Sequence, residues 1–131
     1  MSRILIVEDE ILVASEMSYI LEDGGHHCVG IAPDLASAET FFDEKLDLAL
    51  VDLNLRDGLT GPEIGRRLSS AGVPVIFVTA NPAQLHQGVA GTIGVLTKPT
   101  DEATLLAAVN FGLERACGHA AVAPPAMRLF G

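Results

Sequence analysis

Carboxylate side chains follow two short apolar runs of this chain, and their placement favours metal and phosphoryl chemistry. Residues 4–7 lead into Glu8 and Asp9, and residues 46–51 lead directly into Asp52. A carboxylate beside a buried strand is costly to desolvate unless cations or hydrogen bonds compensate its charge. Carboxylate oxygens are the ligands that Mg²⁺ prefers, and an acceptor carboxylate beside Mg²⁺ is suited to phosphoryl transfer.

A hydroxyl and a cation follow two further apolar runs. Thr79 follows residues 73–78, and Lys98 follows residues 93–96 after one intervening threonine. A fixed positive charge beside several acids would help to neutralise them and would also attract an anion. Thr79 taken alone fits a strand-end hydroxyl as well as it fits a phosphoryl ligand, so its role stays open at this point.

Two other acids of the same regions have structural explanations. Asp57 precedes Gly58, and Asp-Gly is common turn chemistry, so we expect Asp57 to shape a loop. Glu10 lies where a helix should begin, and an acid there favours the helix dipole. Asp52 is therefore the preferred acceptor.

The elements that must position these residues alternate along the chain. Apolar runs predict strands at 4–7, 28–31, 46–51, 73–78 and 93–96. Helical periodicity or capping residues predict helices at 10–22, 34–44, 60–72 and 102–117, and the glycine-rich stretch 81–94 predicts a short or mobile one. This alternation predicts an α/β fold with a parallel sheet that is covered by helices on both faces. In such sheets the ligand site lies beyond the carboxyl ends of the strands.

Composition predicts one soluble domain at residues 1–117, followed by a tail. The chain has 131 residues, is 49% hydrophobic and carries a formal net charge of -9. This charge would repel nucleic acids and anionic membranes. We expect residues 118–131 to form a flexible tail, although Met127, Leu129 and Phe130 could also dock on the body or on a partner.

The cysteines and the apolar runs predict a cytoplasmic location. Cys28 and Cys117 lack the spacing of a metal site, and free thiols fit a reducing compartment. The apolar run at residues 4–7 is too short for a signal peptide or a membrane span.

Four short motifs in chain order resemble the receiver domain of a bacterial two-component response regulator. They are ILIVEDE, LALVDLNL, IFVTA and LTKP, and the resemblance covers Arg3 to Leu113. It implies a flavodoxin-like, doubly wound five-stranded parallel sheet of order 2-1-3-4-5.

The resemblance also implies a role for each matching residue. Asp52 would accept a phosphoryl group from a sensor histidine kinase or a phosphotransfer protein. Lys98 would pair with the phosphoryl oxygens, and the Thr79 hydroxyl would act as the switch. The implied Mg²⁺ ligands are Glu8, Asp9, Asp52 and the main-chain carbonyl of Asn54.

This sequence departs from the family pattern near its own acceptor. Val95 stands where receivers usually carry a Tyr or Phe whose rotation reports the phosphorylation state. Arg56 stands where a proline is common, in a loop that is one residue longer. The stretch from Thr79 to Lys98 is also short. These features resemble an alphaproteobacterial subgroup that includes receivers paired with HWE-type kinases.

The resulting hypothesis is a stand-alone receiver that signals through a protein partner or acts as a phosphate sink, and that is not a turnover enzyme. One alternative is a pseudo-receiver that binds partners without phosphate. Another is a small phosphohydrolase, but such enzymes usually place a second acid where this chain has Asn54.

Overall fold

A six-stranded sheet forms the centre of the protein in the computed structural model, which describes residues 1–130. The strands are β1 (Arg3–Val7), β2 (His27–Ala32), β3 (Leu48–Val51), β4 (Val75–Thr79), β5 (Gly94–Thr97) and β6 (Arg128–Leu129). Their order is β2-β1-β3-β4-β5-β6, with the first five strands parallel and β6 antiparallel to β5. The predicted doubly wound order of the five parallel strands is confirmed, and β6 is an addition to it.

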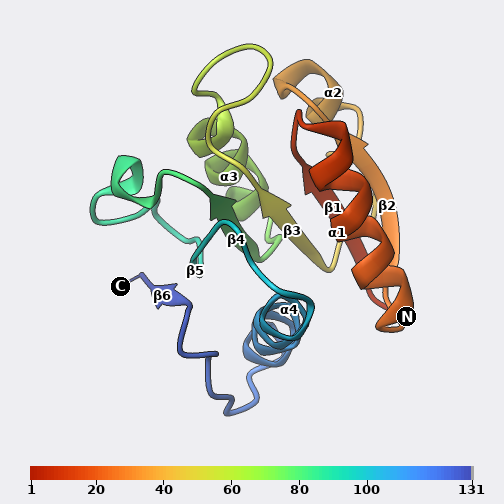
Figure 1. The fold of residues 1–131 in the computed structure, drawn as a ribbon, viewed down its shortest axis with the longest axis vertical. Coiled ribbons are helices and arrows are strands. Elements are labelled where there is room, and N and C mark those ends of the chain that lie inside the picture. The colour runs from red at the N-terminus through yellow and green to blue at the C-terminus, as the bar shows by residue number, and fades with distance from the viewer. Residues whose placement is uncertain (131) are drawn as a thin grey trace.

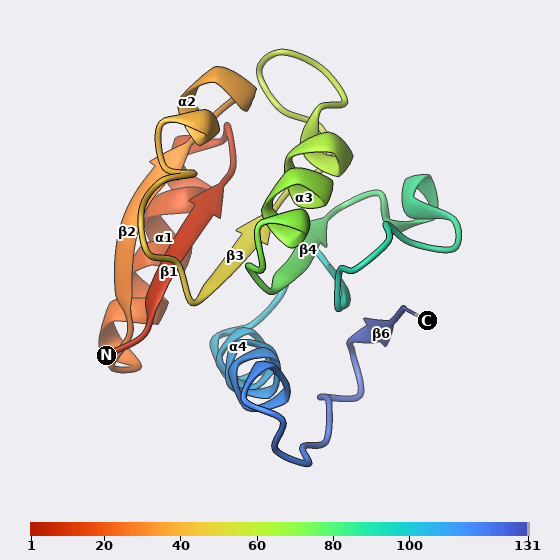
Figure 2. The same cartoon turned by 180° about the vertical axis from the view of Figure 1, so that it is seen from behind.

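Helices cover both faces of this sheet (Figures 1 and 2). One apolar cluster lies between the sheet and the helices α1 (Ile11–Asp23) and α4 (Glu102–Ala116). The second lies under α2 (Leu35–Glu39) and α3 (Gly61–Ser70). Every residue of β3 and β4 is buried, because a parallel sheet with two covered faces has no solvent side. Within residues 1–130, no helix is both long and apolar enough to cross a membrane.

The helix after β2 begins where the sequence predicts but ends earlier. The Asp34 carboxylate caps α2 by accepting a hydrogen bond from the Ser37 amide at 2.8 Å. The helix ends at Glu39 and not at the predicted residue 44. The Thr40 hydroxyl donates to the Ser37 carbonyl at 2.7 Å, a local bond of the kind that competes with helix continuation.

The connection between β4 and β5 contains one short 3₁₀ helix, η1 (Pro82–Leu85), in place of a fifth α-helix. The chain then turns through Gly88 and Gly91, whose φ angles are +106° and +82°. Glycine adopts such angles without steric cost, and they are incompatible with a continuing α-helix. The expectation of a short helix here is met, and the helix that forms is a single 3₁₀ turn.

Only part of the predicted flexible tail, residues 118–131, is docked on the body: residues 118–126 form no helix or strand, and residue 131 lies outside the described residues. Residues 128–129 form β6 along β5, and the side chains of Met127 and Phe130 are buried. Burial of two large apolar side chains, added to backbone pairing, offsets the entropy of ordering this segment. The alternative of docking on the body is therefore the one that the structure supports.

Candidate functional site: an acidic pocket at the carboxyl edge of the sheet

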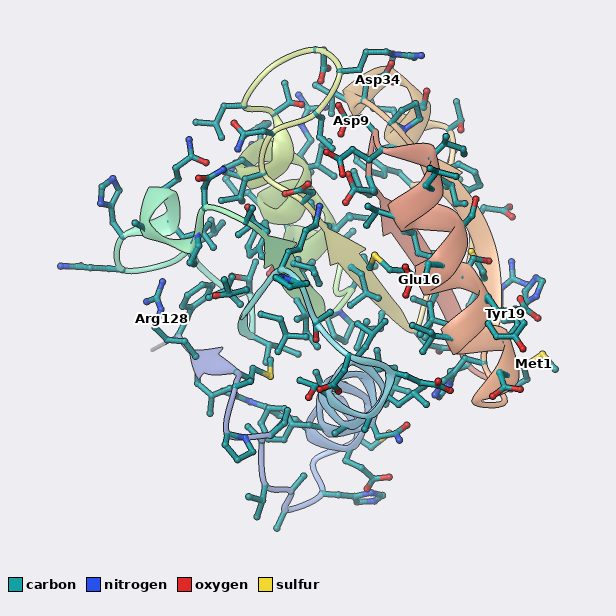
Figure 3. The ribbon with its side chains drawn as sticks, viewed as in Figure 1. Met1, Asp9, Glu16, Tyr19, Asp34 and Arg128 are labelled. Carbon is teal, nitrogen blue, oxygen red and sulfur yellow. The ribbon has the colours of Figure 1, made fainter. Side chains whose placement is uncertain are left out.

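Three carboxylates meet at the carboxyl ends of β1 and β3. These strands are direct neighbours, with Val7 paired to Val51, so the residues that follow them lie side by side. One oxygen each of Glu8, Asp9 and Asp52 lies within 4.8 Å of the others. Glu8 is buried and Asp52 is 9% exposed, whereas Asp9, labelled in Figure 3, is exposed.

Lys98 joins two of these acids from the end of β5. Its ammonium donates to an Asp52 carboxylate oxygen at 2.7 Å and also to Glu8. The other Glu8 oxygen accepts the Glu10 amide at 3.2 Å. Both oxygens of Glu8 are therefore engaged, and two neighbouring carboxylates share one cation.

Burial and neighbouring charges shift two pKa values in this pocket. Burial raises the pKa of the Glu8 carboxyl above its ordinary value, although the hydrogen bond from Lys98 opposes the effect. Burial also disfavours the charged ammonium of Lys98. Its hydrogen bonds to Asp52 and Glu8 together outweigh that effect and raise the pKa of Lys98. Lys98 consequently remains a cation at neutral pH.

The backbone holds Asp52 in a fixed position. Its amide donates to the Val7 carbonyl at 2.9 Å, and one of its carboxylate oxygens accepts the Leu53 amide at 2.7 Å. Gly61, at the start of α3, lies so close that a Cβ there would collide with the Asp52 carbonyl and the Leu53 backbone. The sequence identified Gly61 only as part of a helix start, because this close approach depends on how α3 packs.

Thr79 ends β4 beside the acids and is fully buried. Its hydroxyl accepts the Asn81 amide at 3.1 Å. A cavity of about 280 Å³ opens between this strand end and the acidic cluster. It is lined by Asp9, Glu10, Asp52, Asn54, Leu55, Thr79, Ala80, Asn81 and Lys98. The six predicted site residues are thus brought together. Glu8 does not line the cavity, but its bond to Lys98 joins it to the residues that do.

Asn54 connects the pocket to the β4–β5 loop. Its side-chain amide donates to the side-chain oxygen Oε1 of Gln84 at 2.8 Å. Gln84 belongs to η1, and sequence reasoning did not single it out. A polar residue in a weakly patterned segment gives no signal of its own, so only the fold reveals this contact.

Asp57 lies apart from the acidic cluster and organises the loop, as predicted. Its carboxylate accepts the Leu35 amide at 3.1 Å and the Thr60 hydroxyl at 2.6 Å. These bonds lower the pKa of Asp57, with the Thr60 bond as the main cause. Arg56, in the same loop, pairs with Asp34 at the start of α2.

The donor set suits a hard divalent cation. Three carboxylates supply oxygen ligands at one place, and the exposed Asp9 leaves room for the waters that Mg²⁺ retains. The single ammonium of Lys98 does not neutralise three acids, so a bound dication would complete the charge balance.

Comparison with known proteins agrees with this fold. Residues 4–110 match the response regulator receiver domain family. The chain is 36% identical over 90 residues to the phyllosphere-induced regulator PhyR of Methylorubrum extorquens, covering 66% of this chain and 34% of PhyR. It is 32% identical to protein PilH of Pseudomonas aeruginosa, covering 84% of this chain and 96% of PilH.

A solved structure shows the same architecture. The receiver domain of the Erythrobacter litoralis PhyR response regulator superposes with a TM-score of 0.73 at 31% identity, covering 89% of this chain and 90% of that one. The chain spans 34% of the length of the curated PhyR relative and about half, 52%, of several others.

A doubly wound sheet with an acidic pocket and a strand-end lysine defines a signalling receiver module. The chain belongs to the response regulator receiver domain family of two-component signalling. Receiver domains bind Mg²⁺ in an acidic pocket, and this chain has an acidic cluster at the corresponding edge of its sheet.

Proposed function

We propose that this receiver accepts a phosphoryl group on Asp52 from the phosphohistidine of a sensor histidine kinase or a histidine phosphotransfer protein. It would then act through a protein partner or as a phosphate sink. The observation that carries the proposal is the 2.7 Å hydrogen bond from Lys98 to Asp52 inside a three-carboxylate pocket. This arrangement leaves one acid fixed, nearly buried and beside a permanent cation.

In the proposed reaction, an Asp52 oxygen forms a bond to phosphorus while the bond from phosphorus to the imidazole nitrogen breaks. The imidazole leaves with the electron pair and takes up a proton. Repulsion between the anionic nucleophile and the anionic phosphoryl group is the main obstacle. Mg²⁺ held by Glu8, Asp9, Asp52 and the Asn54 carbonyl would supply the charge that offsets it.

Lys98 and Thr79 would stabilise the product. The Lys98 ammonium already touches Asp52, so it needs little movement to pair with an added phosphoryl oxygen. The Thr79 hydroxyl has a proton to donate while its oxygen accepts the Asn81 amide. A bond from Thr79 to the phosphoryl group would therefore also move the first residues of the β4–β5 loop, because Asn81 is bonded to the same hydroxyl.

Labelling with phosphoramidate and Mg²⁺, followed by intact-mass measurement, tests the proposal. The wild-type protein should gain the mass of one phosphoryl group, and chelation of Mg²⁺ should prevent the gain. Asp52→Asn should abolish labelling, while Asp57→Asn, in the same loop but bonded to Leu35 and Thr60, should retain it. Labelling that survives in Asp52→Asn and disappears in Asp57→Asn would overturn the assignment. A wild-type protein that takes no label would favour a phosphate-independent binding module.

A further inference from the structure

The segment 127–130, called here the docked tail, is built into the sheet edge. Leu129 pairs with Gly94, Arg128 pairs with Val95, and the Phe130 amide donates to the Ile93 carbonyl at 3.0 Å. Met127 packs into the apolar cluster on the α1 and α4 face. Phe130 packs into the opposite cluster, so the docked tail is anchored on both faces of the sheet.

Two glycines make room for this segment. A Cβ on Gly94 would collide with the Arg128 carbonyl, so the close approach of β6 requires glycine at that position. A Cβ on Gly88 would come within 2.5 Å of the Phe130 ring. The receiving surface is therefore shaped around the docked tail.

The docked tail also holds the β4–β5 loop. The Arg128 guanidinium reaches from β6 to that loop and donates to the His86 carbonyl at 3.2 Å (Figure 3). A second, longer bond of 3.5 Å reaches the Pro82 carbonyl. These acceptors lie at the two ends of η1, and the Phe130 ring lies against Gly88 just beyond it.

The other side of this loop contacts the acidic pocket. Gln84 of η1 bonds to Asn54 at 2.8 Å, and Asn81 bonds to the Thr79 hydroxyl. Ala80 and Asn81 line the cavity that contains Asp52. One short loop thus has the phosphoacceptor pocket on one side and the docked tail on the other.

Phe130 belongs to the apolar cluster that also contains Val95, the position where receivers usually carry a reporter aromatic. The ring of Phe130 lies 6.4 Å from that of Phe77 on β4. Val95 has no ring that could change rotamer. The docked tail supplies an aromatic side chain to this cluster from a different part of the chain.

We infer that the docked tail is an internal ligand of the β5 edge that is released when Asp52 is phosphorylated. This inference rests on the proposed function. The docked tail is bonded both to the fixed edge of β5 and to the loop after Thr79. If Thr79 and the loop move toward a phosphoryl group, the docked tail cannot keep both its pairing with β5 and its Arg128 bonds to the loop. β6 has only two residues, so little pairing is lost on release, and the β5 edge becomes open to a partner strand.

Trypsin cleavage after Arg128 reports release, because docking engages the Arg128 side chain and backbone. The full chain is compared with and without beryllofluoride and Mg²⁺, and the loss of the residues beyond Arg128 is followed by intact mass. Beryllofluoride should accelerate this cleavage about fivefold or more, the lower range of typical coupling between sites. Asp52→Asn under the same conditions controls for effects on trypsin itself.

Fluorine NMR of protein-bound beryllofluoride separates the two ways in which this experiment can fail. If the anion binds and cleavage after Arg128 is unchanged or slower, the inference about the docked tail is wrong, while the phosphoacceptor function stands. If the anion does not bind, the proposed function fails and the inference falls with it.

Linkage requires the reverse effect as well. Because bound beryllofluoride would favour release, Phe130→Ala should bind beryllofluoride about fivefold more tightly than wild type. Leu129→Ala is the matched control, since Leu129 lies in the same strand with its side chain 45% exposed. Gly94→Ala disturbs docking from the sheet side and should reproduce Phe130→Ala. Equal affinities in Phe130→Ala, Gly94→Ala and wild type would contradict the inference.

Discussion

The ammonium of Lys98 lies 2.7 Å from the Asp52 carboxylate, and the two residues are 46 positions apart in the chain. The same ammonium contacts Glu8, which is 90 positions away. This pairing joins the ends of β1, β3 and β5 at one edge of the sheet. It explains how acids that would repel one another can lie side by side before any metal binds.

Lys98→Ala should destabilise the metal-free protein by about 1–3 kcal/mol, because Asp52 and the buried Glu8 lose their shared cation. Urea unfolding in the presence of EDTA measures the effect. Lys45→Ala removes an exposed lysine and should change the free energy of unfolding by about 0.5 kcal/mol or less. Equal effects of the two substitutions would show that the Lys98 contacts contribute nothing specific.

Mg²⁺ should raise the thermal midpoint of the wild-type protein, because only the folded chain brings the three carboxylates together. At about 100 times the dissociation constant, the gain in unfolding free energy is about 2.7 kcal/mol. Asp9→Asn should reduce this gain and leave the metal-free midpoint nearly unchanged, since the Asp9 side chain is exposed. A midpoint insensitive to Mg²⁺ in the wild type would count against a metal site here.

Glu8 should make stability fall as the pH rises. Burial raises the pKa of Glu8 in the folded state, so folding favours its protonated form. The contribution of Glu8 to the free energy of unfolding is fully present below its unfolded-state pKa of 4.5. It is lost as the pH rises through the raised pKa of the folded state. Urea unfolding in EDTA should therefore show wild type losing stability relative to Glu8→Gln from pH 4.5 upward. If wild type instead gained stability relative to Glu8→Gln over this range, the pKa of Glu8 would be lowered by folding and not raised.

Asp34 should have the opposite pH dependence. The hydrogen bond from the Ser37 amide is the main cause that lowers the pKa of Asp34 to about 2, and Arg56 adds to it. The resulting contribution to stability is present above the unfolded-state pKa of 3.8. It is lost as the pH falls toward the folded-state pKa of about 2. Asp34→Asn keeps a side chain that can cap the helix, but its stability should not show this fall at acid pH. Unfolding curves measured across the acid range would test this difference from wild type. Asp43→Asn, which removes an exposed acid, serves as the control.

Gly61→Ala should impair both folding and labelling. The added Cβ would press on the Asp52 carbonyl, at an expected cost of about 1–3 kcal/mol for an overpacked site. Displacement of the Asp52 backbone should also slow phosphoramidate labelling. Ser70→Ala changes an exposed position of the same helix and should affect neither measurement. Normal labelling in a stable Gly61→Ala protein would show that the Asp52 backbone tolerates the shift.

The carboxyl edge of the sheet could be predicted because the signals are local. Apolar runs that are followed at once by Glu8, Asp52 or Thr79 report both a buried strand and the polar residue at its end. Parallel strands all end at one edge, so these residues must lie near one another whatever the helices do. Asp57 could be assigned to a turn for a similar reason, because Asp-Gly favours turns locally.

The tertiary structure alone determined the contacts between distant segments. The bond from Gln84 to Asn54, the contact of Gly61 with the Asp52 backbone, and the docking of Phe130 depend on how loops and helices pack against the finished sheet. Periodicity reports which side of an element is apolar, but it does not report which partner covers that side. The sequence by itself therefore determined where the acids stand, and the fold decided which cation, loop and tail meet them.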